Sequence, residues 1–237
     1  MSTRMNVDLP KILHRNKTKE LTYFATKRLF RLVGKPPKAY VTDLVNEGKP
    51  VIFLHAPKVA GTSLRAMLRT GGHSHSMPRH VLRERFWLNS FSITSVRHPF
   101  DRFVSAYTYF VKSDFRGVLY RAHGAALTQL DPFTFQKFIL QYPEKLGHQS
   151  NWACYPSPQK PRADVVLRLE ESETWMDQLA ASGLDLKGRQ LEHRNVSRES
   201  GKNYEQLLDL TASDVQRLRE TVYSAYKSDY IDFDYEA

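Results

Sequence analysis

The stretch "PVIFLHAPKVAGTSLRAMLR" (50–69) constrains the fold more than any other segment. Its first six residues, 50–55, form a short apolar run with the β-branched Val51 and Ile52, which is typical of a buried strand. Residues 62–69 have the apolar spacing of a helix, and small residues join the two segments. A strand, a small-residue loop and a helix suit phosphate binding, because the helix N-terminus offers free N–H groups and a positive dipole end.

The remaining sequence continues this alternation of strands and helices. Thr211 and Asp214 form a capping pattern at the start of the last helix, and Asp131 with Pro132 begins an earlier one. Such alternation favours a parallel sheet. We therefore expect one α/β domain over 39–237, a three-layer fold resembling P-loop kinases, with a short central parallel sheet flanked by helices. The further predicted strands are 90–99 and 163–171, and the further predicted helices are 101–111, 131–140 and 211–230.

The positive charge is concentrated at the N-terminus. The chain carries a net charge of +10, but residues 1–38 hold 10 Lys/Arg against 2 Asp/Glu, which leaves +2 for the rest. This distribution argues against a globally basic nucleic-acid binder. Residues 18–33 fit an amphipathic helix, which either docks on the domain or lies on an anionic membrane surface.

The sequence also limits compartment and cofactor. Cys154 is the only cysteine, so an intrachain disulfide and a Cys-x-x-Cys zinc site are excluded. The N-terminal residues are too polar for a signal-peptide core, and no apolar run reaches the length of a membrane span. We expect a cytoplasmic protein, with contact to the inner membrane face through the basic arm as one role for that arm.

The loop differs from the nucleotide-binding Walker pattern. Lys58 precedes Gly61 instead of following it, the first glycine of the pattern is missing, and Thr62 and Ser63 come directly after Gly61. No acidic residue is clearly placed at a strand end to hold magnesium. These features disfavour an ATP-using kinase without excluding it.

A second basic site follows the second predicted strand in "SVRHPFDRFVSAY" (95–107). Arg97 comes at the C-terminal end of that strand, where ligands of open α/β sheets bind, and Ser105 follows on the next helix. A guanidinium matches phosphate geometry, so the two side chains suit a second phosphate. The alternative is that Arg97 pairs with Asp101 and Ser105 only packs.

Together the two stretches resemble the sulfotransferase family. "HAPKVAGTSL" is similar to the loop that binds the 5′-phosphosulfate, usually P-K-[TA]-[AG]-[GS]-T-S, and "VRHPFDRFVSAY" to the 3′-phosphate motif R-[DN]-P-x-x-R-x-x-S-x-Y. The chain looks closest to Golgi carbohydrate sulfotransferases and their bacterial relatives. "VLRLEES", "HRNVSRES" and "YSAYKSDYIDFDY" resemble further family stretches. The resemblance covers roughly 49–235, with His98 in place of Asp or Asn and Val59 in place of Thr.

This resemblance implies a donor and roles for the residues above. The donor would be 3′-phosphoadenosine 5′-phosphosulfate, with no metal required. Lys58 would neutralise the bridging oxygen, and Arg97 and Ser105 would hold the 3′-phosphate. The 5′ end would be held by Ala60, Gly61, Thr62 and Ser63. The acceptor would be a hydroxyl, on a glycan or glycolipid.

The catalytic base is expected between the two motifs, in "GGHSHSMPRHVLRER" (71–85). A histidine suits this role because its ordinary pKa is about 6.5. His75 is our first choice, His73 the second, and His80 lies nearby; Glu84 is left open as a carboxylate base. A solvated loop or an adventitious metal site would explain the same histidines.

Three other functions remain compatible with the residues alone. They are a nucleotide or small-molecule kinase, a non-catalytic nucleotide-binding module, and a polyanion-binding or membrane-binding protein. In "GHQSNWACYP" (147–156), Trp152 and Tyr155 suit stacking on a sugar, and ordinary aromatic packing explains them equally well.

Overall fold

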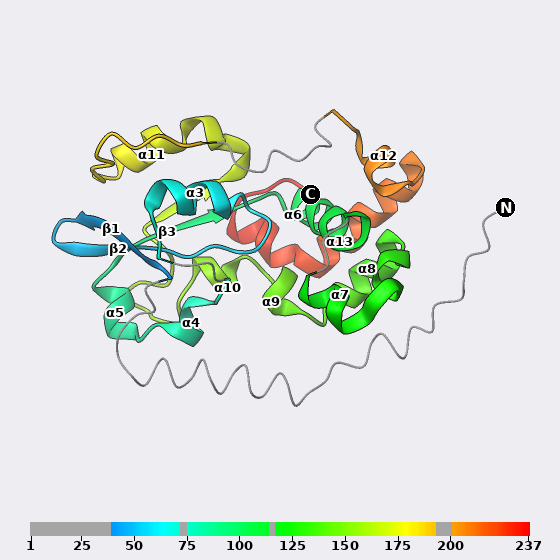
Figure 1. The fold of residues 1–237 in the computed structure, drawn as a ribbon, viewed down its shortest axis with the longest axis horizontal. Helices are drawn as coiled ribbons and strands as arrows, with labels where there is room; N and C mark the ends of the chain where they lie inside the picture. Colours follow the sequence, from blue (N-terminus) through cyan, green and yellow to red (C-terminus); the bar gives the residue numbers. More distant parts are fainter. Residues whose placement is uncertain (1–38, 72–74, 114–116, 193–200) are drawn as a thin grey trace.

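The computed structural model describes residues 39–71, 75–113, 117–192 and 201–237. The predicted basic arm (1–38), with its amphipathic helix, lies outside these residues. The described part has a four-stranded sheet at one end and a helical half at the other (Figure 1). The strands are β1 (Val41–Asn46), β2 (Lys49–Phe53), β3 (Phe91–Val96) and β4 (Val165–Arg168).

The sheet has the order β1-β2-β3-β4, and β2, β3 and β4 run parallel. This confirms the α/β prediction and its three strands. The edge strand β1 was not predicted; it pairs antiparallel with β2 through a tight hairpin. Glu47 and Gly48 form the turn with positive φ angles of 49° and 76°. In β1, buried Thr42, Leu44 and Asn46 alternate with more exposed neighbours, as in a strand that is covered on one face.

Helices cover both faces of the sheet, as the three-layer prediction requires. Val51 and Phe53 face α3 and α11, whereas Ile52 and Leu54 face α4 and α5 on the other side. α3 and α11 lie on the same side of the sheet (Figure 1). These helices are α3 (Gly61–Leu68), α4 (Pro78–Val81), α5 (Glu84–Leu88) and α11 (Trp175–Ala181).

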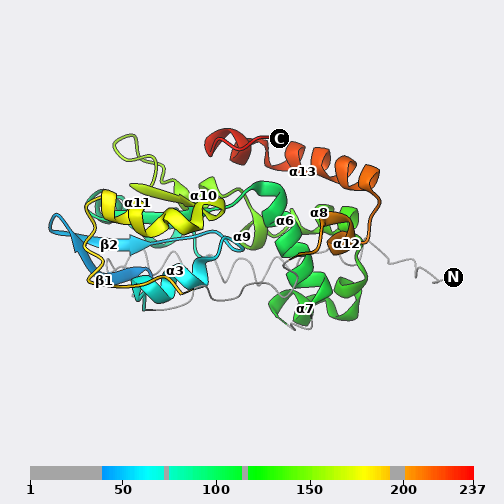
Figure 2. The same cartoon turned by 90° about the horizontal axis from the view of Figure 1, so that it is seen from above.

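The helical half has its own apolar core, rich in aromatic rings from α6, α8 and α13. α13 packs against α6, which leads from the sheet into this half (Figure 2). The helices here are α6 (Pro99–Tyr107), the π-helix η1 (Thr108–Lys112), α7 (Val118–His123), the 3₁₀-helix η2 (Gly124–Gln129), α8 (Pro132–Ile139), α9 (Pro143–Leu146), α12 (Tyr204–Leu208) and α13 (Ala212–Asp232). The two remaining short helices are α10 (Ser150–Ala153) and the 3₁₀-helix η3 (Leu169–Thr174), which packs against β4 and α11.

The predicted elements differ from the observed ones mainly at their ends. The predicted helix 101–111 is α-helical only to Tyr107 and continues as a π-helix. The predicted strand 163–171 ends at Arg168, where the chain turns into η3. Caps predicted at Asp131 and Thr211 are present, since both side chains accept backbone N–H groups. None of the described helices is both long and apolar enough to cross a membrane.

Candidate functional site

The phosphate loop, defined here as residues 54–60, connects β2 to α3. Lys58 and Ala60 both have left-handed backbone conformations, with φ of 71° and 55°. Ala60 is the N-cap of α3, and no side chain caps that helix. Because the first amide groups of a helix lack partners within it, this turn offers N–H donors to an anion. The side chain of Thr62 is exposed here, whereas Ser63 is buried.

The glycine that begins α3 is required by a close contact. A Cβ atom on Gly61 would lie 1.9 Å from Cδ2 of His55. The His55 ring is buried and stacks on Phe53, with ring centroids 4.8 Å apart. His55 therefore cannot move aside without disturbing the core, and glycine allows α3 to begin directly against the ring.

We expect Gly61→Ala to lower the melting temperature. Overpacking of this kind costs about 1–3 kcal/mol, which corresponds to roughly 2–12 °C in a domain of this size. Differential scanning calorimetry measures the shift. The control is the same change in a His55→Ala background, where the clashing ring is absent. There, Gly61→Ala should lower the melting temperature less than it does in the unsubstituted protein. An unchanged melting temperature in Gly61→Ala would contradict the proposed clash.

Lys58 and Arg97 bring two positive charges to one edge of the sheet. Because β2 and β3 are parallel neighbours, the loop after β2 and the residue after β3 lie at the same edge. The Lys58 ammonium lies 3.9 Å from the ring centroid of Tyr109, which belongs to η1. Burial, and next the charge of Arg97, lower the pKa of Lys58 to about 8. The two cations thus interact, and an anion between them would relieve their repulsion.

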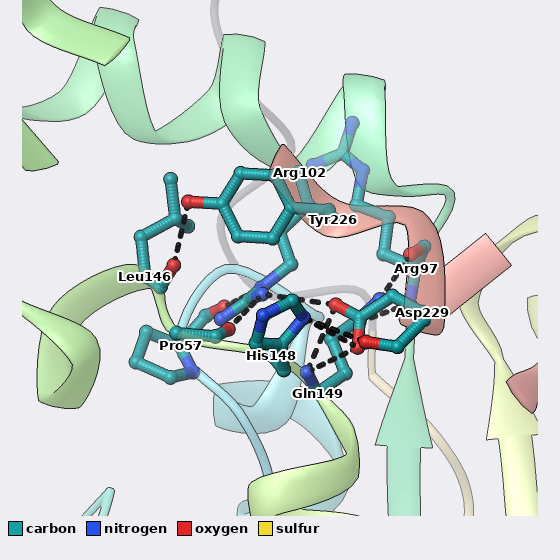
Figure 3. A network of polar contacts seen from close by, with 10 residues as sticks. Pro57, Arg97, Arg102, Leu146, His148, Gln149, Tyr226 and Asp229 are labelled. Carbon is teal, nitrogen blue, oxygen red and sulfur yellow. Dashed lines mark hydrogen bonds and ion pairs between the residues drawn. The ribbon is translucent and has the colours of Figure 1, made fainter. Parts of the chain in front are cut away.

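The guanidinium of Arg97 is available to a ligand. Arg97 is held through its backbone, and its side chain points away from the surrounding polar network (Figure 3). The alternative pairing with Asp101 is not formed among the described residues, since Asp101 instead accepts a hydrogen bond from the hydroxyl of Tyr204. Ser105 lies two turns into α6 and is half-buried.

His98, the departure from the family pattern, is fixed by residues far along the chain. Its backbone N–H donates to Glu170 Oε1 at 2.7 Å. Its Nε2 lies 3.1 Å from the carbonyl oxygen of Glu236, and its ring meets the edges of Tyr230 and Tyr235. The turn before α6 is therefore held by Glu170 and the C-terminal segment.

Among the candidate bases, His75 has a direct contact with a phosphate-loop residue. Its ring packs edge-on against His55, with centroids 4.7 Å apart. His80 is instead beside Arg79 on α4, and Glu84 is exposed in the first turn of α5. His73 lies outside the described residues.

A sulfotransferase family model matches residues 43–236, which is most of the chain. The chain belongs to the sulfotransferase family. Searches of curated proteins and of solved structures found no match. The family shows that this protein is an enzyme of sulfuryl transfer, which requires a sulfate donor.

The stacking role considered for Trp152 and Tyr155 in this sulfotransferase is wrong. Both rings are buried, so neither offers a face to a sugar. Trp152 Nε1 donates to the carbonyl oxygen of His75 at 2.9 Å, and the Tyr155 hydroxyl donates to that of Leu82 at 3.1 Å. The two rings thus hold the segment that carries the candidate base.

A buried polar network behind the site was missed from the sequence. The network consists of Arg102 on α6, Gln149 in the turn before α10, and Asp229 on α13. Each of these side chains is almost completely buried (Figure 3). Arg102, Gln149 and Asp229 all lie inside stretches that the sequence singled out, Asp229 in "YSAYKSDYIDFDY". Their periodicity gave no sign of burial, because charged and amide side chains are usually exposed.

The described residues of the sulfotransferase contain no group of three or more His, Cys, Asp or Glu side chains arranged to hold a metal ion.

Proposed function

We propose that this sulfotransferase uses 3′-phosphoadenosine 5′-phosphosulfate and transfers its sulfuryl group to a hydroxyl, on a glycan or glycolipid. The observation that carries the proposal is the pair of cationic sites, Lys58 and Arg97, at the ends of neighbouring parallel strands. This donor has anionic groups at its 5′ and 3′ positions. A nucleotide with phosphates only at its 5′ position would not require the second site.

The 5′ end of the donor suits the phosphate loop. The N–H groups at the start of α3 and the Thr62 hydroxyl bind the 5′-phosphate oxygens. Lys58 stabilises the negative charge that develops on the bridging oxygen as the bond to sulfur breaks. Arg97 binds the 3′-phosphate by charge-assisted hydrogen bonds, with Ser105 as a neutral partner on α6.

Transfer proceeds by in-line displacement. The acceptor oxygen forms a bond to sulfur while the bond from sulfur to the bridging oxygen breaks, and that electron pair stays on the 5′-phosphate. The proton of the acceptor hydroxyl passes to His75, which acts as general base. The position of His75 beside the phosphate loop supports this role. The acceptor class rests on the likeness of the motifs to those of carbohydrate sulfotransferases.

Nucleotide binding tests the donor. We expect calorimetry to show much tighter binding of 3′-phosphoadenosine 5′-phosphate, below called the bisphosphate, than of AMP or ADP. Arg97→Ala should remove about 10–100-fold of that preference, because one hydrogen bond to a charged group contributes about 1.5–3 kcal/mol.

The control for Arg97→Ala is Arg121→Ala, an exposed arginine on α7, which should leave the preference unchanged. Equal affinity of the unsubstituted protein for the bisphosphate and AMP would rule out this donor. Binding of ATP with magnesium in preference to the bisphosphate would favour the kinase alternative.

A further inference from the structure

We infer that Gln149 and Asp229 are positioning residues. They hold Arg97 and the phosphate loop in the relative positions that binding the 3′ and 5′ ends of one donor molecule requires. This inference rests on the proposed function. Neither residue is assigned contact with the donor. Gln149 acts through the backbone of Arg97. Asp229 acts one step further back, through Gln149 and Arg102.

Gln149 holds the backbone of Arg97 from two sides. The N–H of Arg97 donates to Gln149 Oε1 at 2.8 Å, and Gln149 Nε2 donates to the carbonyl oxygen of Arg97 at 2.8 Å. The side-chain amide thus pairs with Arg97 as a neighbouring strand would. Both bonds need a carboxamide, since one end accepts and the other donates. They fix the point at which the Arg97 side chain leaves the sheet.

Asp229 fixes Gln149 in turn. The backbone N–H of Gln149 lies 2.8 and 2.9 Å from the two carboxylate oxygens of Asp229. Asp229 is fully buried on α13, one turn after a break in that helix at Tyr226. The Tyr226 hydroxyl donates to the carbonyl oxygen of Leu146 at 2.7 Å, so α13 is tied to this segment at two points, Leu146 and Gln149.

The same carboxylate is connected to the phosphate loop through Arg102. Arg102 Nη1 lies 3.9 Å from Asp229 Oδ2 and donates to the carbonyl oxygen of Gly147 at 2.7 Å. Arg102 Nε donates to the carbonyl oxygen of Pro57 at 3.0 Å. Pro57 directly precedes Lys58. Asp229 is therefore connected to both donor-binding segments through one intermediate residue each, Gln149 for Arg97 and Arg102 for the phosphate loop (Figure 3).

Stability alone explains this network poorly. Burial raises the pKa of Asp229 and lowers that of Arg102, while each charge partly offsets the effect on the other. Apolar residues of similar volume often replace a buried ion pair without loss of stability. The hydrogen bonds of Gln149 and Arg102 go instead to backbone groups at Arg97, Pro57 and Gly147. Because these partners belong to or adjoin the donor-binding segments, the network is better explained by a role in positioning those segments than by stability alone.

The test compares nucleotide selectivity with stability in matched variants. Gln149→Met keeps the volume and removes both hydrogen bonds to Arg97. The control is Gln136→Met, which changes another buried glutamine, on α8 in the helical half. For each variant, calorimetry gives the affinity for the bisphosphate and for AMP, and a thermal scan gives the melting temperature.

We expect Gln149→Met to lower the preference for the bisphosphate over AMP about tenfold or more, with AMP affinity retained. Gln136→Met should keep the preference whatever its melting temperature. If Gln149→Met folds and keeps the preference, or loses affinity for both nucleotides equally, the positioning role of Gln149 is wrong.

Asp229→Asn provides a second arm, which also serves if Gln149→Met does not fold. Because Asp229 is connected to both segments, this change should lower the affinity for both nucleotides, and the affinity for the bisphosphate should fall more. The matched control is Asp232→Asn, at an exposed position of the same helix. Unchanged affinities in Asp229→Asn would overturn the inference. If the unsubstituted protein shows no preference for the bisphosphate, the proposed function fails and this inference fails with it.

Discussion

His75→Ala is expected to reduce turnover by about 10²–10⁴-fold while bisphosphate affinity stays near that of the unsubstituted protein. The reason is that a general base acts on the acceptor proton and has no contact with the phosphates of the donor. The His75 ring lies against His55, and it is the His55 ring that lies against the start of α3, so loss of the His75 ring should leave the phosphate loop in place. Turnover is measured with a panel of sugars and phenols as acceptors.

Three further variants and a pH profile complete this test. His73→Ala, His80→Ala and Glu84→Ala should be milder. The rate should rise through the neutral range as the imidazole loses its proton, and His75→Ala should lose that limb. Near-normal turnover in His75→Ala, with a collapse in His73→Ala or Glu84→Ala, would move the base to that residue. The donor assignment would stand, because it depends on other side chains.

Lys58→Ala should lower turnover by about 10²–10³-fold and weaken bisphosphate binding much less. The ammonium is needed most as charge develops on the bridging oxygen, so its loss affects the transition state more than the ground state. A rise in the Michaelis constant for the donor with turnover unchanged would show that Lys58 only binds. Lys112→Ala, an exposed lysine of η1, is the control.

The pH dependence gives Lys58 a second signature. Burial and Arg97 lower its pKa to about 8 in the free enzyme. As the pH rises through 8, Lys58 loses its proton and its charge, so kcat/KM should fall. Binding of an anionic donor favours the charged form and raises this pKa, so the fall in kcat should come at higher pH. Lys58→Arg should remove the alkaline limb, because a guanidinium stays protonated throughout this range.

Local patterns predicted the elements that build the site. The strand, loop and helix around Lys58 could be predicted because an apolar run, small residues and helical spacing are all local signals. Strand β1 was missed, since only its alternate residues are buried and three of its six residues are Thr, Asp or Asn. The π-helix that places Tyr109 under Lys58 has no comparable sequence signal.

The network behind the site could not be predicted for a different reason. Gln149 lies 52 residues from Arg97 and 80 residues from Asp229. Contacts over such separations depend on the packing of whole elements, and one sequence carries no direct sign of them. The same limit explains Trp152, whose ring suggested stacking on a sugar but is enclosed by the protein.

The position of Asp229 on α13 links the donor to the integrity of that helix. Local opening of α13 would remove the carboxylate that holds Gln149 and balances Arg102, so the opened form should bind the donor weakly. By thermodynamic linkage, a ligand that prefers the closed form must also disfavour opening. Substitutions anywhere along α13 that loosen its packing against α6 would then lower donor affinity without touching the site. The free energy of opening α13 would thus set part of the donor affinity, so that a change in the stability of this helix also changes the affinity.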